Sequence, residues 1–124
     1  MARILVIDDD SEIRLLVRHI LEKDNHEVTE AIDSEEGIQA FEQNTPDLVI
    51  TDIFMPGRDG HGTIEKLTRE HPGVKIIAMT GHGTAKNNEY LRIAESLGAR
   101  QTLSKPFTVK DVQQAVLAVL GTDT

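Results

Sequence analysis

The sequence is constrained most strongly by a regular alternation between short apolar runs and longer segments with helical periodicity. Residues 4–7, 48–50 and 74–79 are runs rich in aliphatic and β-branched side chains, which is typical of strands buried on both faces. Residues 27–32 are more polar and predict a strand at the edge of a sheet, and residues 101–104 predict a short fifth strand.

Five segments with apolar residues at i, i+3 and i+4 separate or follow these runs, and each predicts an amphipathic helix. Asp10 or Ser11 can cap the first helix, residues 11–23, and the segment 33–36 is a capping-box pattern at the start of the second. Gly98 is a suitable residue to end the fourth. The predicted apolar faces comprise Ile13, Leu16, Val17, Ile20 and Leu21; Ile38 and Phe41; Ile64 and Leu67; Tyr90, Ile93, Ala94 and Leu97; and Val109, Val112, Val116, Val119 and Leu120.

Five strands that alternate with five helices imply a parallel α/β sheet with helices on both faces. Right-handed crossovers leave few topologies, and we expect a flavodoxin-like (βα)5 three-layer sandwich with strand order 2-1-3-4-5. The 124 residues are enough for one hydrophobic core, so we expect residues 1–124 to form a single domain.

The composition excludes several classes of function. Thirteen basic and 21 acidic residues give a net charge of −8, which argues against direct binding to nucleic acid or to anionic membranes. The absence of cysteine excludes disulfides and thiolate metal sites. No apolar run reaches the ~20 residues that a membrane helix needs, and the run after Met1 is too short for a signal peptide. We therefore expect a soluble, cytoplasmic protein.

Chemically active side chains lie at the carboxyl ends of four predicted strands. Asp8 and Asp9 follow the first strand, Asp52 the third, Thr80 the fourth and Lys105 the fifth. Ligands of open α/β sheets bind at this edge, so the three carboxylates, the hydroxyl and the ammonium are expected to share one pocket. Taken singly, each has an ordinary alternative as a helix cap, a turn residue or a surface lysine.

Three adjacent carboxylates repel one another unless a hard cation lies between them, and an all-oxygen site suits Mg²⁺, or Mn²⁺ in its place. Asp9 and Asp52 are expected to bind the ion directly, with Asp8 orienting the site or binding through water. A carboxylate can also attack phosphorus, and Asp52 is the candidate nucleophile. Lys105 would neutralise the phosphoryl group and Thr80 would donate a hydrogen bond to it. We also predict a cis peptide bond before Pro106.

Four segments together resemble the receiver domain of response regulators, and the resemblance covers essentially the whole chain. Residues 4–10, Ile-Leu-Val-Ile-Asp-Asp-Asp, are similar to its first strand and acidic pair. Residues 48–56 with Asp59-Gly60 are similar to its phosphoacceptor strand and loop. Residues 78–81 and 104–107 are similar to the segments that carry its switch threonine and its lysine.

The resemblance implies a partner in two-component signalling. A histidine kinase or histidine phosphotransfer protein would donate a phosphoryl group to Asp52, and Asp9, Asp52 and the backbone carbonyl of Phe54 would bind Mg²⁺. Phosphorylation would draw Thr80 inward and switch the surface formed by residues 85–120, which controls an unknown output partner; a phosphorylation-dependent dimer is compatible with this. The chain would catalyse only its own phosphorylation and dephosphorylation, and would not be an enzyme for external substrates.

The sequence departs from the family pattern at three places. Thr102 occupies the position of an aromatic residue that often rotates with the switch threonine, and the segment 80–98 is slightly longer than usual. Phe54 and His82 are expected to flank the phosphoryl group, where small or amide residues are common. Phe54 would shield the acyl phosphate from water, whereas His82 is interpreted equally well as an exposed loop residue. Arg14 and Arg18, one helical turn apart, are interpreted as a solvated face that a kinase could contact.

Three alternative functions agree less well with the sequence. A phosphohydrolase with an aspartyl nucleophile usually has a second carboxylate shortly after it as general acid, and here Phe54 is two residues on. A receiver-like binding module without phosphorylation would not need the complete set of three aspartates, threonine and lysine. A flavin-binding protein would not place three aspartates after its first strand, because they would repel the flavin phosphate.

Overall fold

The computed structural model describes residues 2–53, 60–81 and 85–121 of the chain. Five parallel strands form one sheet in the order β2-β1-β3-β4-β5, which confirms the predicted topology. The edge strands are β2, as its polar sequence predicted, and β5. The strands are β1 (Arg3–Ile7), β2 (Glu27–Ala31), β3 (Leu48–Asp52), β4 (Ile76–Thr80) and β5 (Gln101–Ser104).

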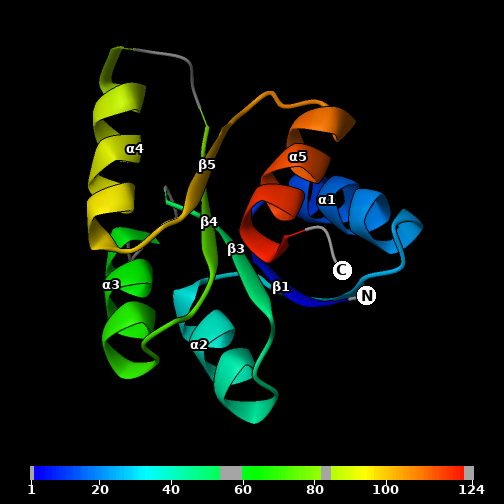
Figure 1. Ribbon diagram of the computed structural model, residues 1–124, viewed down its shortest axis with the longest axis horizontal. Coiled ribbons are helices and arrows are strands. Elements are labelled where there is room, and N and C mark those ends of the chain that lie inside the picture. Colours follow the sequence, from blue (N-terminus) through cyan, green and yellow to red (C-terminus); the bar gives the residue numbers. More distant parts are fainter. Residues whose placement is uncertain (1, 54–59, 82–84, 122–124) are drawn as a thin grey trace.

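Helices cover both faces of the sheet, so the fold is the expected flavodoxin-like three-layer sandwich (Figure 1). Two helices lie on one face and three on the other. The chain moves across the sheet in one direction from β1 to β2 and in the opposite direction from β2 through β3 and β4 to β5, so right-handed crossovers place the connecting helices on opposite faces. The first face carries α1 (Ser11–Lys23) and α5 (Val109–Leu120). The second carries α2 (Ser34–Gln43), α3 (Gly60–Glu70) and α4 (Ala85–Leu97).

The alternation of side chains along each strand divides the apolar interior into two cores. Ile4 and Val6 of β1 pack beneath α1 and α5, whereas Leu5 and Ile7 pack beneath α2 and α3. The same division applies to β3 and β4, whose residues are all buried. Strands that are apolar on both sides therefore read as unbroken hydrophobic runs in the sequence.

Polar residues at the helix ends fix where α1 and α2 begin. Asp10 caps α1, since its carboxylate accepts hydrogen bonds from the amides of Glu12 and Ile13. Asp33 caps α2 by accepting from the amide of Glu36 at 2.8 Å. The Glu36 carboxylate accepts from the amide of Ile32 at 2.9 Å, so the reciprocal bond of the capping box is shifted by one residue from its usual place.

Three residues assigned to apolar helix faces are exposed, and this part of the prediction is wrong. Leu16 is 42%, Ile93 40% and Val109 51% exposed. The buried stripe of α1 is confined to one narrow side of the helix, and Leu16 falls at its margin.

The fourth strand begins at Ile76, two residues later than expected. Within the described residues, no helix has the length and hydropathy that a bilayer span requires.

Candidate functional site

The four strand ends predicted to form a site lie along one edge of the sheet. Asp52 is the last residue of β3 and Thr80 the last of β4, while Asp8 and Lys105 each follow a strand directly. Pairing continues beyond the strands, because the Asp8 amide donates to Ala31 O at 3.1 Å and the Lys105 amide donates to Thr80 O at 2.8 Å. These bonds fix the backbone from which the functional side chains extend.

Lys105 lies at the centre of the site. Its ammonium donates to Asp8 Oδ2 at 2.8 Å and to Asp52 Oδ2 at 3.1 Å. The Lys105 side chain is 14% exposed, compared with 0% for Asp8 and 6% for Asp52. A single cation therefore joins residues that are 97 and 53 positions away in the sequence, and it partly neutralises two buried carboxylates. The predicted convergence of these three side chains is confirmed.

The carboxylates of Asp8, Asp9 and Asp52 form a group that could bind a metal ion. One oxygen from each lies within 4.8 Å of the others, and Asp9 is exposed whereas the other two are buried. Three carboxylate oxygens are a donor set for a hard cation such as Mg²⁺, which takes carboxylates and completes its coordination with water. The exposed Asp9 leaves one side of the group open to solvent, so the residues present fit such an ion.

Burial and the proximity of the charged groups change the pKa values of Asp8 and Lys105. Burial, assisted by the charge of Asp52, raises the pKa of Asp8 above 3.8, although hydrogen bonds from Lys105 and the Asp10 amide oppose it. For Lys105, burial alone lowers the pKa, but the contacts with Asp8 and Asp52 together outweigh it and raise the pKa above 10.5. Lys105 is therefore fully charged at neutral pH, and a further cation would relieve the repulsion at Asp8.

The three consecutive aspartates have different structural functions. Asp10 is the helix cap, while Asp8 accepts from the Asp10 amide at 2.9 Å and contributes its other oxygen to Lys105. Asp9 lies between them, is exposed to solvent, and contributes a carboxylate oxygen to the acidic group. The alternative interpretation of these aspartates as helix caps therefore holds for Asp10.

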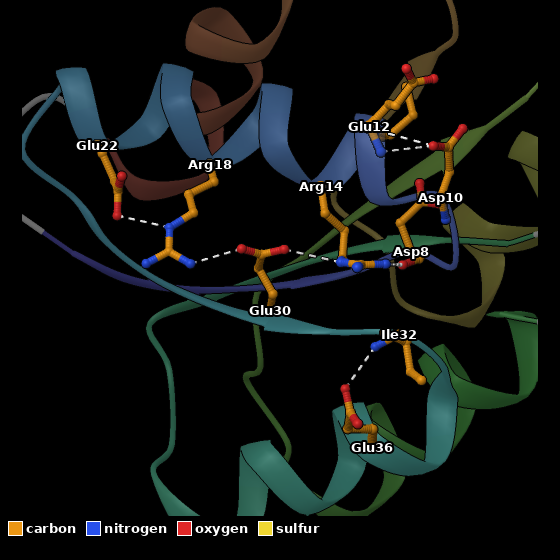
Figure 2. A network of polar contacts seen from close by, with 10 residues as sticks. Asp8, Asp10, Glu12, Arg14, Arg18, Glu22, Glu30, Ile32 and Glu36 are labelled. Carbon is orange, nitrogen blue, oxygen red and sulfur yellow. Dashed lines mark hydrogen bonds and ion pairs between the residues drawn. The ribbon is translucent and has the colours of Figure 1, made fainter.

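Arg14 is a functional candidate that the sequence did not reveal, and its assignment to a solvated face is wrong. Its side chain is 14% exposed and donates from Nη1 to the carbonyl of Asp8 at 2.7 Å and from Nε to Glu30 at 3.0 Å (Figure 2). Arg18 is more exposed, at 41%, and contacts Glu30 and Glu22. The helical spacing of the two arginines predicted their proximity, but nothing in it indicated their different burial.

The remaining predicted residues are distributed as follows. Thr80 is fully buried at the end of β4, and Thr102 is half-buried in β5 opposite Ala78. The Lys105–Pro106 peptide bond is cis, as predicted. Phe54 and His82 lie outside the described residues, so their expected places beside a phosphoryl group stay predictions.

Comparisons with known proteins agree on one family. A sequence model described as the response regulator receiver domain matches residues 4–117. The probable transcriptional regulator ycf27 of Guillardia theta is 35% identical over 95% of this chain, which spans only 45% of that protein. The chemotaxis protein CheY of Halobacterium salinarum is 33% identical, with 95% of this chain and 96% of that protein aligned. The crystal structure of the receiver domain of NtrX from Brucella abortus matches with a TM-score of 0.89 and 32% identity, covering 97% of this chain and 99% of that one.

Proposed function

The chain belongs to the response regulator receiver domain family, and from this premise we propose that Asp52 accepts a phosphoryl group in a Mg²⁺-dependent reaction. Receiver domains bind Mg²⁺ at an acidic pocket, and they interact with histidine kinases and output domains. The observation that carries the assignment to Asp52 is its place in the acidic group, with Lys105 on one carboxylate oxygen.

Asp52 has the surroundings that a carboxylate nucleophile needs. In the proposed step, an Asp52 oxygen forms a bond to phosphorus while the bond from phosphorus to the donor's histidine nitrogen breaks. Phosphoryl transfer of this kind depends mainly on positioning and on neutralising charge. The Lys105 ammonium lies 3.1 Å from Asp52 and can contact an incoming phosphoryl oxygen, and its raised pKa keeps it charged. The donor would be a histidine kinase or a histidine phosphotransfer protein.

The cation would be bound by Asp9 and Asp52 directly, together with the backbone carbonyl of Phe54, with Asp8 orienting the site or binding through water. Bound Mg²⁺ would supply positive charge to the phosphoryl oxygens, and Mn²⁺ could replace it. Both carboxylate oxygens of Asp8 already accept hydrogen bonds, from the Asp10 amide and from Lys105, and this supports an indirect part for Asp8. The exposure of Asp9 leaves the solvent side available for water and phosphate.

The signal would leave the site through β4 and β5. Thr80 is buried at the end of β4, and its carbonyl accepts from the Lys105 amide. A hydrogen bond from the Thr80 hydroxyl to a phosphoryl oxygen would therefore act on the same backbone that carries Lys105. We infer that the surface of α4, β5 and α5 is the output surface, and that a phosphorylation-dependent dimer or a separate output partner could use it.

The residue two positions after Asp52, where a phosphohydrolase with an aspartyl nucleophile usually has its general acid, is Phe54, and this supports self-modification rather than turnover of an external substrate. The chain spans about half the length of curated relatives such as the transcriptional regulator of Guillardia theta. We therefore propose this function for residues 1–124 as one receiver domain, with Asp52 as the reaction centre.

The proposal is tested by incubating the protein with acetyl phosphate and MgCl₂ and measuring its intact mass. The parent is expected to gain one phosphoryl group, and Asp52→Asn is expected to gain none. Asp10→Asn is the matched control, because it removes a neighbouring carboxylate but keeps an oxygen that can cap α1. An equal mass gain in Asp52→Asn would overturn the assignment.

A parallel reaction with p-nitrophenyl phosphate separates the switch from the phosphohydrolase. Release of p-nitrophenol at many equivalents per protein, lost in Asp52→Asn, would favour the hydrolase. A single phosphorylation without such turnover is the result expected of a receiver domain.

A further inference from the structure

We propose that Arg14 is a positioning residue for cation binding, and that it acts by fixing the peptide unit between Asp8 and Asp9. The inference rests on the proposed function, since it assumes that the acidic group binds Mg²⁺. Arg14 lies in the first turn of α1 and does not belong to the acidic group, so its part in metal binding would be indirect.

The contacts of Arg14 converge on the loop that carries the acidic group. Nη1 donates to the Asp8 carbonyl at 2.7 Å, and Nε donates to Glu30 Oε1 at 3.0 Å (Figure 2). The guanidinium is planar and rigid, so two acceptors on different elements determine its orientation. Its 14% exposure shows that it is packed into the structure between α1 and β2.

The hydrogen-bonded carbonyl belongs to the same planar peptide unit as the amide of Asp9. Holding this carbonyl fixes the plane from which the Asp9 backbone continues, and thereby the direction in which its carboxylate leaves the chain. Asp8 is held independently through the Asp10 amide and Lys105. The exposed Asp9 is the member of the acidic group that depends most on its backbone for its position.

Glu30 keeps the Arg14 guanidinium in place. Its two carboxylate oxygens are divided between two arginines, since Oε1 accepts from Arg14 and Oε2 accepts from Arg18 Nη1 at 2.7 Å. Arg18 also contacts Glu22 at 3.0 Å. The two arginines therefore share one partner on β2, but of the two only Arg14 contacts the loop of the acidic group within the described part of the chain (Figure 2).

This difference provides a matched pair of substitutions. Arg14→Lys keeps the positive charge but cannot bond Asp8 and Glu30 with the same fixed geometry. Arg18→Lys makes the same chemical change on the same helix and at the same carboxylate, without touching the Asp8 carbonyl. Because both variants keep their charge, a difference between them cannot come from altered long-range attraction or repulsion of the cation.

The test is Mg²⁺ titration of the unphosphorylated protein by isothermal calorimetry, with urea unfolding of each variant in the absence of Mg²⁺. Loss of a group that orients a metal ligand typically weakens metal binding by 10–100-fold, so Arg14→Lys is expected to raise the Kd about tenfold. Arg18→Lys is expected to change it by less than about twofold. Glu30→Gln, which removes the charge that orients the guanidinium, is expected to fall between them.

A purely structural Arg14 would lower the unfolding midpoint and leave the Mg²⁺ affinity of the folded protein at the parent value, and that result would overturn the proposal. Equal affinities for Arg14→Lys and Arg18→Lys would overturn it as well. The parent serves to distinguish the two levels of inference. If it bound no Mg²⁺, the proposed function would fail together with this one, whereas normal binding by the parent and by Arg14→Lys would reject only the positioning by Arg14.

Discussion

The Lys105 amide donates a 2.8 Å hydrogen bond to the carbonyl of Thr80, while the Lys105 ammonium contacts Asp8 and Asp52. One residue therefore connects the backbone at the end of β4 to the carboxylates at the ends of β1 and β3. A change in charge at Asp52 acts on Lys105 directly, and on Thr80 through a single backbone bond. This linkage makes Lys105 the residue whose replacement is expected to have the largest effect.

Replacing Lys105 with Met is expected to destabilise the protein by roughly 3 kcal/mol at neutral pH, because it leaves two buried carboxylates without their cation. Saturating MgCl₂ should restore part of the loss, since a bound cation would supply positive charge to the same carboxylates. Urea unfolding with and without MgCl₂ measures both effects. Lys66→Met, which removes an exposed pair with Glu70, should cost less than about 0.5 kcal/mol. An unfolding midpoint unchanged in Lys105→Met would contradict the assigned electrostatics.

As the pH is lowered, the Mg²⁺ affinity is expected to begin to fall at a higher pH than it would if Asp8 had the pKa of an exposed aspartate. Burial raises the pKa of Asp8 above 3.8, so protons compete with the cation before an exposed carboxylate would be protonated. The effect on stability has the opposite direction. Because the pKa of Asp8 is higher in the folded state, its protonation raises the free energy of unfolding as the pH falls through that pKa. Calorimetric titrations over the acidic range should show this, and Asp8→Asn should move the loss of affinity to lower pH. A pH profile identical in the variant would argue against Asp8 as its origin.

Glu30→Gln is expected to reduce the free energy of unfolding by about 1 kcal/mol at neutral pH. The hydrogen bond from Arg18 is the largest effect, and with that from Arg14 it outweighs burial and lowers the pKa of Glu30 below 4.5. Its stabilisation is therefore complete above pH 4.5 and is lost as the pH falls through the folded-state pKa. Denaturant unfolding at several pH values should show the parent and variant converging in acid. Glu22→Gln, on the exposed side of the same cluster, should differ from the parent by less than about 0.5 kcal/mol.

Two threonines of α3 are expected to respond oppositely to the same substitution. The buried Thr68 hydroxyl has no hydrogen-bond partner among the described residues, so Thr68→Val should stabilise the protein by about 1 kcal/mol. The Thr63 hydroxyl donates to Ser34 Oγ at 2.5 Å, and Thr63→Val should destabilise by about 1–3 kcal/mol because it leaves the buried Ser34 hydroxyl without this partner. Thermal and urea unfolding measure both changes. Destabilisation by both substitutions would show that the Thr68 hydroxyl makes a favourable contact.

Sequence reasoning succeeded where local chemistry decides the structure. The first helix was predicted with its observed bounds, Ser11–Lys23, because Asp10 is a good cap and the apolar spacing is regular. Alternation of strands and helices predicted a parallel sheet, and right-handed crossovers in a chain of this size favoured the observed strand order. The carboxyl ends of parallel strands then placed Asp52 and Lys105 together. Each of these inferences needs only local sequence patterns, read along the chain, and general rules of topology.

The features that the sequence did not predict depend on how separate elements pack against one another. Arg14 is half-buried because α1 packs against β2 where Glu30 and the Asp8 carbonyl can both reach its guanidinium, and periodicity within α1 carries no information about that packing. Leu16 is exposed because the covered stripe of the helix is narrower than its apolar face. The contact of Thr63 with Ser34 likewise joins two helices whose packing angle no local pattern specifies.

The separation of the apolar side chains by the sheet has a consequence for how this molecule can vary. Side chains beneath α1 and α5 share no space with those beneath α2, α3 and α4, so substitutions such as Val116→Ala and Leu67→Ala should be energetically additive. One face of the protein can be remodelled for a new partner while the opposite face keeps its own. Both faces border the polar residues at the carboxyl ends of the strands, so substitutions on either face must leave the positions of these residues unchanged.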